Sequence, residues 1–425
     1  MGTAWTILMT ALFLLAAAAL VLQWLARSGL RVPLASDGLP ARAGERPERS
    51  ALWKVFALAV AFRCVMALAG LLLYNIGNGA ALGLADLPEL WTRWDGTHYV
   101  NLVEQGYAGY QENGQPLFLV FFPLYVWLTR AVGLLVPDTA LAGMVVSFAC
   151  YGAGCVFLYR LGAEEYGKRI ARWAVVFLSV FPFGFFFGAV MTESLFFLTT
   201  TAALYYIRRH RWVLAGLWGL LAAMTRMQGV LLIGAAAAEL VNWARPFALA
   251  GKARRDSLLS MAKKLPALLL PVVGSLVYLA LNVSVTGDPF AFSRMQAHWS
   301  QGFAWFPGVL QYVAKNALTW PTVSTRWEMW VPELVLFFVF AGVLAASWKR
   351  HRSMFTLYGF VYFILNYCLS WLLSAGRYLS CGVPFFLFAA DLTEKRPRAA
   401  AALAVGMGLL QLVFMTWFLS WRQVM

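Results

Sequence analysis

Apolar stretches of about twenty residues recur along this 425-residue chain, separated by short connectors that carry Pro, Gly and most of the charges. A helix needs about 20 apolar residues to cross a bilayer core of roughly 30 Å. Hydrophobic residues make up 61% of the chain, charged residues make up 12%, and the mean hydropathy is +0.68, which excludes an ordinary soluble protein. We therefore predict an all-α polytopic membrane protein with about 11 to 12 transmembrane helices. The expected spans are 5–26, 53–74, 140–160, 173–190, 192–208, 212–224, 228–243, 265–285, 331–348, 353–373, 379–391 and 399–420.

The net charge of +15 does not indicate a nucleic-acid partner, because Lys and Arg fall in short clusters between the apolar runs. The five cysteines lie within or beside apolar runs and none forms a CxxC pair, so neither a disulfide framework nor a zinc site is expected. The sequence has no Walker motif, no HExxH, no GxSxG and no Gly-rich nucleotide loop. We expect neither a metal nor a nucleotide cofactor.

Residues 117–136 are apolar enough to suggest a further span, but the distribution of positive charge argues against it. If this segment does not cross, 25 of the 34 Lys and Arg lie in cytoplasmic connectors. If it does cross and the first connector stays inside, the 19 Lys and Arg of the last five connectors all face outward, which the positive-inside rule disfavours. Pro123 also divides the segment, and Tyr125 and Trp127 suit an interface. We predict a juxtamembrane helix that lies on the outer surface.

This topology predicts three parts of the chain. Residues 1–50 form an N-terminal span with a basic cytoplasmic connector, 51–392 form the main transmembrane domain, and 393–425 form a C-terminal span. The main domain carries a large first extracytoplasmic loop at 75–139 and a second at 286–330. All the polar turns described below then lie on the extracytoplasmic side.

Acidic residues gather in the first of these loops. The segment 75–116 holds five Asp and Glu against the single Arg93. On a helix that begins near residue 95, Asp95 and His98 share one face. An acid and an imidazole placed together can bind or deprotonate a hydroxyl. The alternative is that Asp95 serves only as the N-cap of that helix.

Three further ionisable residues stand where apolar runs meet. A carboxylate at the position of Glu193 is costly unless it is paired or hydrated, which makes it a functional candidate. Arg226 and Arg377 occupy outward turns, and the planar guanidinium suits a phosphate. The alternatives are that Glu193 only stabilises the start of its helix and that the arginines reach lipid headgroups or pair with Glu193 or another acid. Arg294 and His298 in the second outer loop are weaker candidates.

The segment Arg93-Trp94-Asp95-Gly96-Thr97-His98-Tyr99, followed by Gly106-Tyr107, resembles the R-W-D-x-x-H-[YF]…G-Y signature of the GPI mannosyltransferase 2 family and its bacterial relatives. Later segments agree in order, so that the resemblance covers residues 50–392, whereas residues 5–26 have no counterpart. Met227-Gln228-Gly229 departs slightly from the pattern of many relatives, which puts the role of Arg226 in doubt. The later segments are 121–125, 192–196, 211–216 leading to 225–226, and 377–379.

The resemblance implies a membrane-embedded glycosyltransferase of the C fold (GT-C). Such an enzyme transfers a sugar, typically mannose, from a polyprenyl phosphate to an acceptor hydroxyl at the outer membrane face, with inversion and without a nucleotide. By this resemblance Asp95 is the general base, His98 and Glu193 orient the acceptor or the base, and Arg226 or Arg377 holds the lipid phosphate. Trp94 and Tyr125 are expected to stack on sugar faces. The expected substrate-binding residues are Arg93, Trp94, His98, Tyr125, Glu193, Arg226, Arg294, His298, Arg377 and Tyr378.

Two other functions stay open at this point: a transporter or flippase of a lipid-linked sugar, and a non-catalytic membrane subunit that binds such a lipid. The charged candidates cluster at one membrane face and the sequence shows no internal repeat, which favours an enzyme. No residue pattern identifies the sugar, and the acceptor is open among lipid, glycan and protein hydroxyls. The expected partners are therefore the bilayer, the lipid-linked donor and that acceptor, and the high content of Ala, Leu and Arg favours a bacterial plasma membrane.

Overall fold

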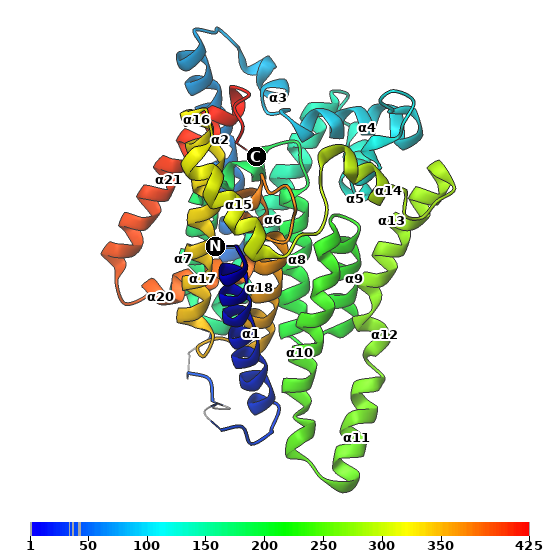
Figure 1. Cartoon of the computed structure of the whole chain (residues 1–425), viewed down its shortest axis with the longest axis vertical. Coiled ribbons are helices and arrows are strands. Elements are labelled where there is room, and N and C mark those ends of the chain that lie inside the picture. Colours follow the sequence, from blue (N-terminus) through cyan, green and yellow to red (C-terminus); the bar gives the residue numbers. More distant parts are fainter. Residues whose placement is uncertain (1, 34, 36–37, 41–43, 425) are drawn as a thin grey trace.

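Helices make up most of the computed structural model, which describes residues 2–33, 35, 38–40 and 44–424 (Figure 1). The described residues form no β-strand, and their only β-pairings are two isolated bridges, Glu112 with Gln115 and Phe303 with Leu369. The α-helices are α1 (Gly2–Arg27), α2 (Arg49–Asn78), α3 (Leu87–Leu90), α4 (Asp95–Gly109), α5 (Pro123–Gly133), α6 (Thr139–Tyr166), α7 (Lys168–Val180), α8 (Glu193–Arg208), α9 (Trp212–Ala223), α10 (Leu232–Ala244), α11 (Gly251–Ala262), α12 (Leu265–Leu268), α13 (Leu270–Thr286), α14 (Ala291–Met295), α15 (Phe306–Thr319), α16 (Val323–Thr325), α17 (Val331–Ser347), α18 (Ser353–Asn366), α19 (Ala375–Ser380), α20 (Val383–Thr393) and α21 (Pro397–Leu419). Short 3₁₀ turns lie at η1 (Leu84–Asp86), η2 (Leu117–Val120), η3 (Gly184–Gly188), η4 (Met227–Leu231), η5 (Pro246–Ala248) and η6 (Gln296–Trp299), and one π-helical turn lies at η7 (Arg326–Trp330).

Six helical segments in the described residues are long and apolar enough to cross a membrane, and a bent pair, α13 with α14 and η6, makes a possible seventh. The prediction of an all-α polytopic membrane protein is confirmed. The other expected spans correspond to shorter helices, among them α7, α8, α9, α18 and α20. The expected total of about 11 to 12 spans stays a prediction, because helix length alone supports fewer.

Two expected spans are interrupted, which corrects their predicted boundaries. The span predicted at 173–190 breaks after α7, where Pro182 removes a backbone donor and η3 follows. The span predicted at 353–373 ends earlier, at Asn366, and the chain then runs without regular structure to α19. Apolar composition therefore located these segments, but their helices are shorter than the apolar runs.

The apolar segment 117–136 folds as η2 and α5, with α5 starting at Pro123. An 11-residue helix rises about 16 Å, roughly half of a bilayer core. The amide of Leu124 donates to the carbonyl oxygen of Met224 at 3.1 Å, which fixes the start of α5 against the α9–η4 turn. The position of α5 relative to a membrane surface stays a prediction.

Helix α6 is the centre of the bundle, because it packs against α2, α5, α7 and α8. Glycines on α6 permit this close packing. A Cβ at Gly154 would lie 2.5 Å from the ring of Phe197 on α8, and one at Gly162 would lie 3.0 Å from the Cα of Ala171 on α7.

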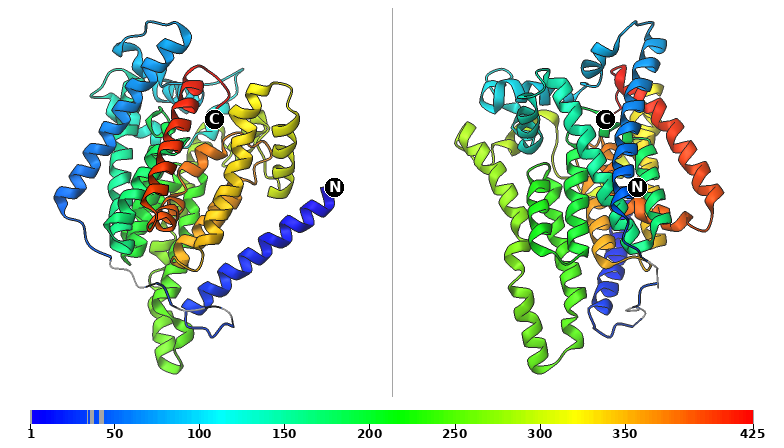
Figure 2. Two further views of the ribbon diagram at one scale, coloured as in Figure 1. Left: turned by 90° about the vertical axis from the view of Figure 1, so that its left-hand side faces the viewer. Right: turned by 180° about the vertical axis from the view of Figure 1, so that it is seen from behind.

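The two ends of the molecule differ in charge. The basic helix α11 and the described residues of the connector between α1 and α2 lie at the lower end in Figure 1, whereas α3 and α4 lie at the upper end. Helix α1 slants along one side of the bundle, and the indole Nε1 of Trp5 donates to the carbonyl oxygen of Pro307 at 2.9 Å (Figure 2). The acid-rich segment and the basic connectors are therefore at opposite ends.

Candidate active site

A tight turn places Asp95 at the start of α4. Trp94 is the residue before the helix, and its backbone has φ 51° and ψ −121°, a conformation that costs a residue other than glycine on the order of 1–3 kcal/mol. The amides of Gly96 and Thr97 donate to the carbonyl oxygens of Arg93 and Trp94 at 2.9 and 3.1 Å. Trp94 is thus the N-cap residue, and the hydrogen bond found for the Asp95 side chain among the described residues comes from Arg377, so the simple N-cap interpretation does not account for it.

The carboxylate of Asp95 belongs instead to a chain of four alternating charges. Arg377 on α19 donates both to Asp95 Oδ2 and to Glu193 Oε1 at the start of α8. Arg226, between α9 and η4, donates from Nη2 to the same Glu193 oxygen and from Nε to Thr192 Oγ1 at 2.9 Å. The order Asp95, Arg377, Glu193, Arg226 brings together residues that are up to 282 positions apart in the sequence. We call these four residues the charge chain.

Burial differs along the charge chain. Glu193 is fully buried, and Arg226 and Arg377 are 8% and 5% exposed, whereas the side chain of Asp95 is 34% exposed. Buried charges are tolerated when they are paired and hydrogen-bonded, which is how the three inner residues are held. Asp95 is therefore the member that a molecule from outside the protein reaches first.

Aromatic rings surround the two arginines. The Arg226 guanidinium lies 5.7 Å from the ring centroid of Phe196 and 5.6 Å from that of Tyr378, and Arg377 lies 5.4 Å from Phe186. Cations within about 6 Å of a ring centroid are attracted to the ring face. These rings limit where each guanidinium can move.

Two buried polar atoms of the charge chain have no hydrogen-bond partner among the described residues: Arg226 Nη1 and Glu193 Oε2. Buried polar groups are normally satisfied, so each of these two atoms needs an explanation. An unsatisfied guanidinium N–H is suited to an anionic oxygen, which makes Arg226 Nη1 a candidate contact for a phosphate.

Glu333 on α17 supports the charge chain, although the sequence analysis did not select it. Its two carboxylate oxygens accept from the backbone amide of Ala375 at 2.8 and 3.1 Å, which anchors the start of α19 two residues before Arg377. The available signal was an acid inside an apolar run, and such residues are functional candidates by default.

His98 and Arg93 do not join the charge chain. His98 Nδ1 lies 2.9 Å from the hydroxyl of Tyr110, and the imidazole stacks on Phe118 with 4.4 Å between ring centroids. Burial lowers the pKa of His98 more than the carboxylate of Asp95 raises it, so the imidazole is neutral at physiological pH. Arg93 donates from Nε to the carbonyl oxygen of Leu419 at 3.1 Å.

The remaining predicted residues fall into two groups. Trp94 and Tyr378 lie beside the charge chain, since Trp94 precedes Asp95 and Tyr378 follows Arg377. Tyr125, Arg294 and His298 are not brought to it. Tyr125 is fully buried and its hydroxyl donates to the carbonyl oxygen of Gly143 at 2.9 Å, so its ring is not open to a sugar.

Arg294 and His298 lie in the second outer loop, on α14 and η6. Arg294 is exposed and pairs with Asp288. His298 lies against Trp299 with 4.9 Å between ring centroids. No contact between these two side chains and the charge chain is found among the described residues, so their predicted substrate roles lack support from the geometry.

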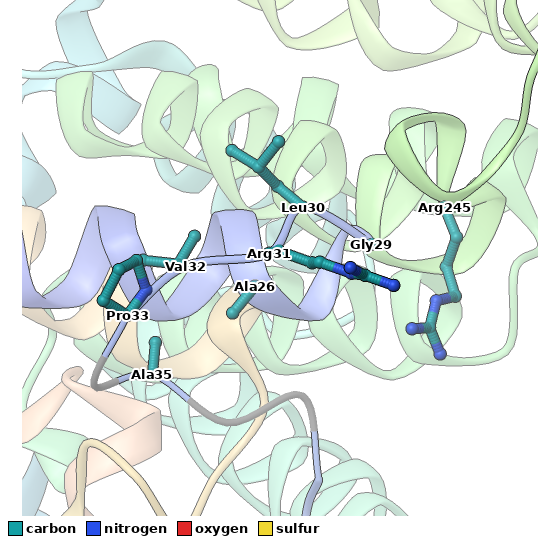
Figure 3. A pocket seen from close by; sticks show the side chains of 8 residues that line it. All are labelled: Ala26, Gly29, Leu30, Arg31, Val32, Pro33, Ala35 and Arg245. Atoms are coloured by element: carbon teal, nitrogen blue, oxygen red, sulfur yellow. The ribbon is translucent and has the colours of Figure 1, made fainter.

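A cavity of about 460 Å³ lies at the basic end, and it is lined by Ala26, Gly29, Leu30, Arg31, Val32, Pro33, Ala35 and Arg245 (Figure 3). The side chains of Arg31 and Arg245 extend at its edge (Figure 3). This cavity is separate from the charge chain and contains none of the predicted site residues. No group of three His, Cys, Asp or Glu side chains suited to a metal ion occurs in the part of the chain that the structure describes, and the expectation of a metal-free site stays a prediction.

Residues 116–279 match the model of the dolichyl-phosphate-mannose-protein mannosyltransferase family. The matched segment is less than half of the chain and includes Glu193 and Arg226, but neither Asp95 nor Arg377. A search of curated proteins finds no match. The description of the matched family agrees with the predicted enzyme class, while membership of the GPI mannosyltransferase 2 family stays a prediction.

Several solved structures are similar to this chain. ArnT from Cupriavidus metallidurans bound to undecaprenyl phosphate has 15% sequence identity and a TM-score of 0.49, with 82% of this chain and 63% of that chain covered. ArnT in the apo state has 15% identity and a TM-score of 0.47, covering 73% and 56%. AglB from Archaeoglobus fulgidus, in complex with an inhibitory peptide and a dolichol-phosphate, has 12% identity and a TM-score of 0.41, covering 85% and 55%. The chain thus spans less than two thirds of the length of these structures.

Proposed function

We propose that this chain is a membrane glycosyltransferase of the GT-C type, which transfers a sugar from a polyprenyl-phosphate donor to an acceptor hydroxyl. The charge chain is the observation that carries the proposal, because it combines one accessible carboxylate with two buried guanidinium groups. The partial family match and the R-W-D-x-x-H-Y segment support the same reaction class, and they favour mannose as the sugar. We propose no cofactor and no metal.

In the proposed reaction, the acceptor hydroxyl oxygen attacks the anomeric carbon of the sugar. A new C–O bond forms as the bond between that carbon and the phosphate oxygen breaks, and the configuration inverts. The hydroxyl proton passes to the carboxylate of Asp95, which acts as the general base. The polyprenyl phosphate leaves with the bonding electron pair.

The arginines stabilise the negative charge that develops on the leaving phosphate. Arg226 Nη1 has no partner among the described residues, so it can donate to a phosphate oxygen. Arg377 binds Asp95 in this structure, so a phosphate that binds Arg377 competes with Asp95 for the guanidinium. Binding of the donor phosphate to Arg377 therefore releases the Asp95 carboxylate, which can then accept the proton of the acceptor hydroxyl.

We propose the extracytoplasmic face as the side of the reaction. The basic helix α11 lies at the opposite end of the molecule from α4 (Figure 1). Connectors rich in Lys and Arg are generally retained in the cytoplasm, which supports an outward position of the Asp95 end. The bacterial plasma membrane suggested by composition is part of this proposal.

The test compares sugar transfer from labelled polyprenyl-phosphate mannose by the wild type, Asp95→Asn and Glu104→Gln in membranes that contain equal amounts of protein. Loss of a general base reduces transfer by about 100- to 10,000-fold, which is the expected effect of Asp95→Asn. Glu104 is exposed on the same helix α4, so its substitution controls for the change of charge and should leave transfer intact. Full transfer by Asp95→Asn excludes Asp95 as the base.

The same experiment separates the other functions. Donor lipid that binds without any transfer in the wild type supports a non-catalytic binding subunit. Movement of intact lipid-linked sugar across vesicle membranes, again without transfer, supports a transporter or flippase. Varying the labelled sugar and offering lipid, glycan and peptide acceptors then identifies the two substrates.

A further inference from the structure

The turn that follows α21 contacts the two residues immediately before Asp95. The Arg93 guanidinium lies 4.9 Å from the ring centroid of Trp421, and the Trp94 ring meets the Trp421 ring edge to face at 5.7 Å and 61°. The Nε of Arg93 also donates to the carbonyl oxygen of Leu419 at 3.1 Å. One side chain, Trp421, therefore contacts both residues of the strained turn.

The backbone conformation of Trp94 needs support from neighbouring groups such as Trp421. Trp94 has φ 51° and ψ −121°, a region that only glycine adopts readily, so neighbouring groups must hold it there. Its side chain makes no capping hydrogen bond, and its Nε1 has no partner among the described residues. The ring contact with Trp421 and the anchored side chain of Arg93 are the side-chain interactions that hold this turn, in addition to the bonds from the Gly96 and Thr97 amides.

The turn after α21 is itself tied to the rest of the molecule. Asn78 Nδ2 at the end of α2 donates to Ser420 Oγ at 3.1 Å, and Arg422 Nη1 lies 3.3 Å from Glu328 Oε1 in η7. Val424 is completely buried. Trp421 is thus held from two sides and can act as a fixed support for the Arg93–Trp94 turn.

We propose that Trp421 is a positioning residue of the active site, which holds the Arg93–Trp94 turn so that the carboxylate of Asp95 points toward Arg377. The proposal rests on the proposed function for its kinetic consequence. Its structural part, the support of the turn by Trp421, does not depend on the reaction.

The kinetic test measures transfer by Trp421→Ala at saturating donor and acceptor, together with KM for both. Displacing a catalytic group by about 1 Å costs up to about 100-fold, so we expect kcat to fall by about 10- to 100-fold with little change in KM. Trp421→Phe keeps an aromatic ring against Arg93 and Trp94 and should recover most of the rate. Trp243→Ala is the matched control, since Trp243 is 47% exposed and Trp421 is 49% exposed, and Trp243 lies on α10 near the basic end.

A second variant tests the mechanism of support. Glycine adopts the backbone conformation of residue 94 without strain, so the turn in Trp94→Gly depends less on Trp421. The fold decrease in kcat caused by Trp421→Ala should be several-fold smaller in the Trp94→Gly background than in the wild type. An equal loss in both backgrounds overturns the proposal, as does a rise in KM alone, which would identify Trp421 as a direct substrate contact.

Hydrogen exchange provides a readout that needs no activity. The amides of Gly96 and Thr97 are bonded to the carbonyl oxygens of Arg93 and Trp94, and they should exchange about 10-fold faster in Trp421→Ala than in Trp243→Ala. Unchanged exchange at these two amides overturns the proposal even if the wild type proves inactive. Wild-type inactivity with faster exchange in Trp421→Ala instead contradicts the proposed function and leaves the support of the turn established.

Discussion

At the scale of single residues, Glu193 is the member of the charge chain with the largest expected effect on stability. It is fully buried and accepts hydrogen bonds from both Arg226 and Arg377. Without it, two buried guanidinium groups face each other with no anion between them. Repulsion between the two guanidinium groups and their desolvation then both destabilise the folded state. The loss of stability therefore exceeds that of a lost surface ion pair.

We therefore predict that Glu193→Ala lowers the free energy of unfolding by about 3–5 kcal/mol. The exposed Glu104 on α4 provides the control, and Glu104→Ala should change it by no more than about 0.5 kcal/mol. The free energy of unfolding of both variants is measured in the same detergent, with circular dichroism as the signal. Equal stability of the two variants would show that the Glu193 pairs contribute nothing to folding.

The sequence allowed the four residues of the charge chain to be selected singly, because each is an ionisable group at a turn between apolar runs. Pairing of either arginine with Glu193 was only an alternative to phosphate binding at that stage, and the structure shows that both arginines make this pair. The sequence did not predict the pair of Asp95 with Arg377, since these residues are 282 positions apart and no local pattern records the contact. Trp421 was missed for a related reason. Its importance depends on the backbone of Trp94, and a left-handed φ at a tryptophan has no sequence signal.

At the scale of secondary-structure elements, the short helix α19 presents Arg377 to the charge chain. Glu333 holds its first amide, and the hydroxyl of Tyr362 donates to the carbonyl oxygen of Tyr378 at 2.7 Å. A helix of six residues is not stable alone, so these outside contacts determine where Arg377 lies.

Substitutions at Glu333 test this dependence. Glu333→Gln keeps a side-chain oxygen that accepts from the Ala375 amide, whereas Glu333→Leu removes it and leaves a buried N–H unpaired. We expect transfer by Glu333→Leu to fall by about 10-fold or more through displacement of Arg377, and Glu333→Gln to stay close to the wild type. Size-exclusion profiles that match the wild type confirm that both variants are folded. Equal activity of the two variants contradicts a role for this carboxylate in placing α19.

Element boundaries were predictable only where apolar length and helix length agree. The expected span 331–348 corresponds closely to α17, because that run contains Pro only at its start. The span expected at 173–190 is not one continuous helix, because Pro182 and the glycines of η3 interrupt the helix inside an apolar run. Hydropathy measures burial or lipid contact and does not register such a break.

At the scale of the whole molecule, the separation of charge between the two ends predicts an orientation in the membrane. Helix α11 at the basic end and the C-terminal part of α4 at the other end carry exposed small residues suited to labelling, Ala253 and Ala108. Cys64 is exposed whereas the other four cysteines are buried, so Cys64→Ser provides a background of low reactivity.

In that background, we predict that a membrane-impermeant maleimide added to intact cells labels Ala108→Cys and does not label Ala253→Cys. Opened membranes should allow both to react, which controls for buried or unfolded thiols. The physical reason is that the connectors richest in Lys and Arg are retained in the cytoplasm, so the end with α11 lies inside and the end with Asp95 lies outside. Labelling of Ala253→Cys alone in intact cells would invert the orientation. The lipid-linked donor and the acceptor would then have to be sought on the cytoplasmic face, while the charge chain and its chemistry would be unchanged.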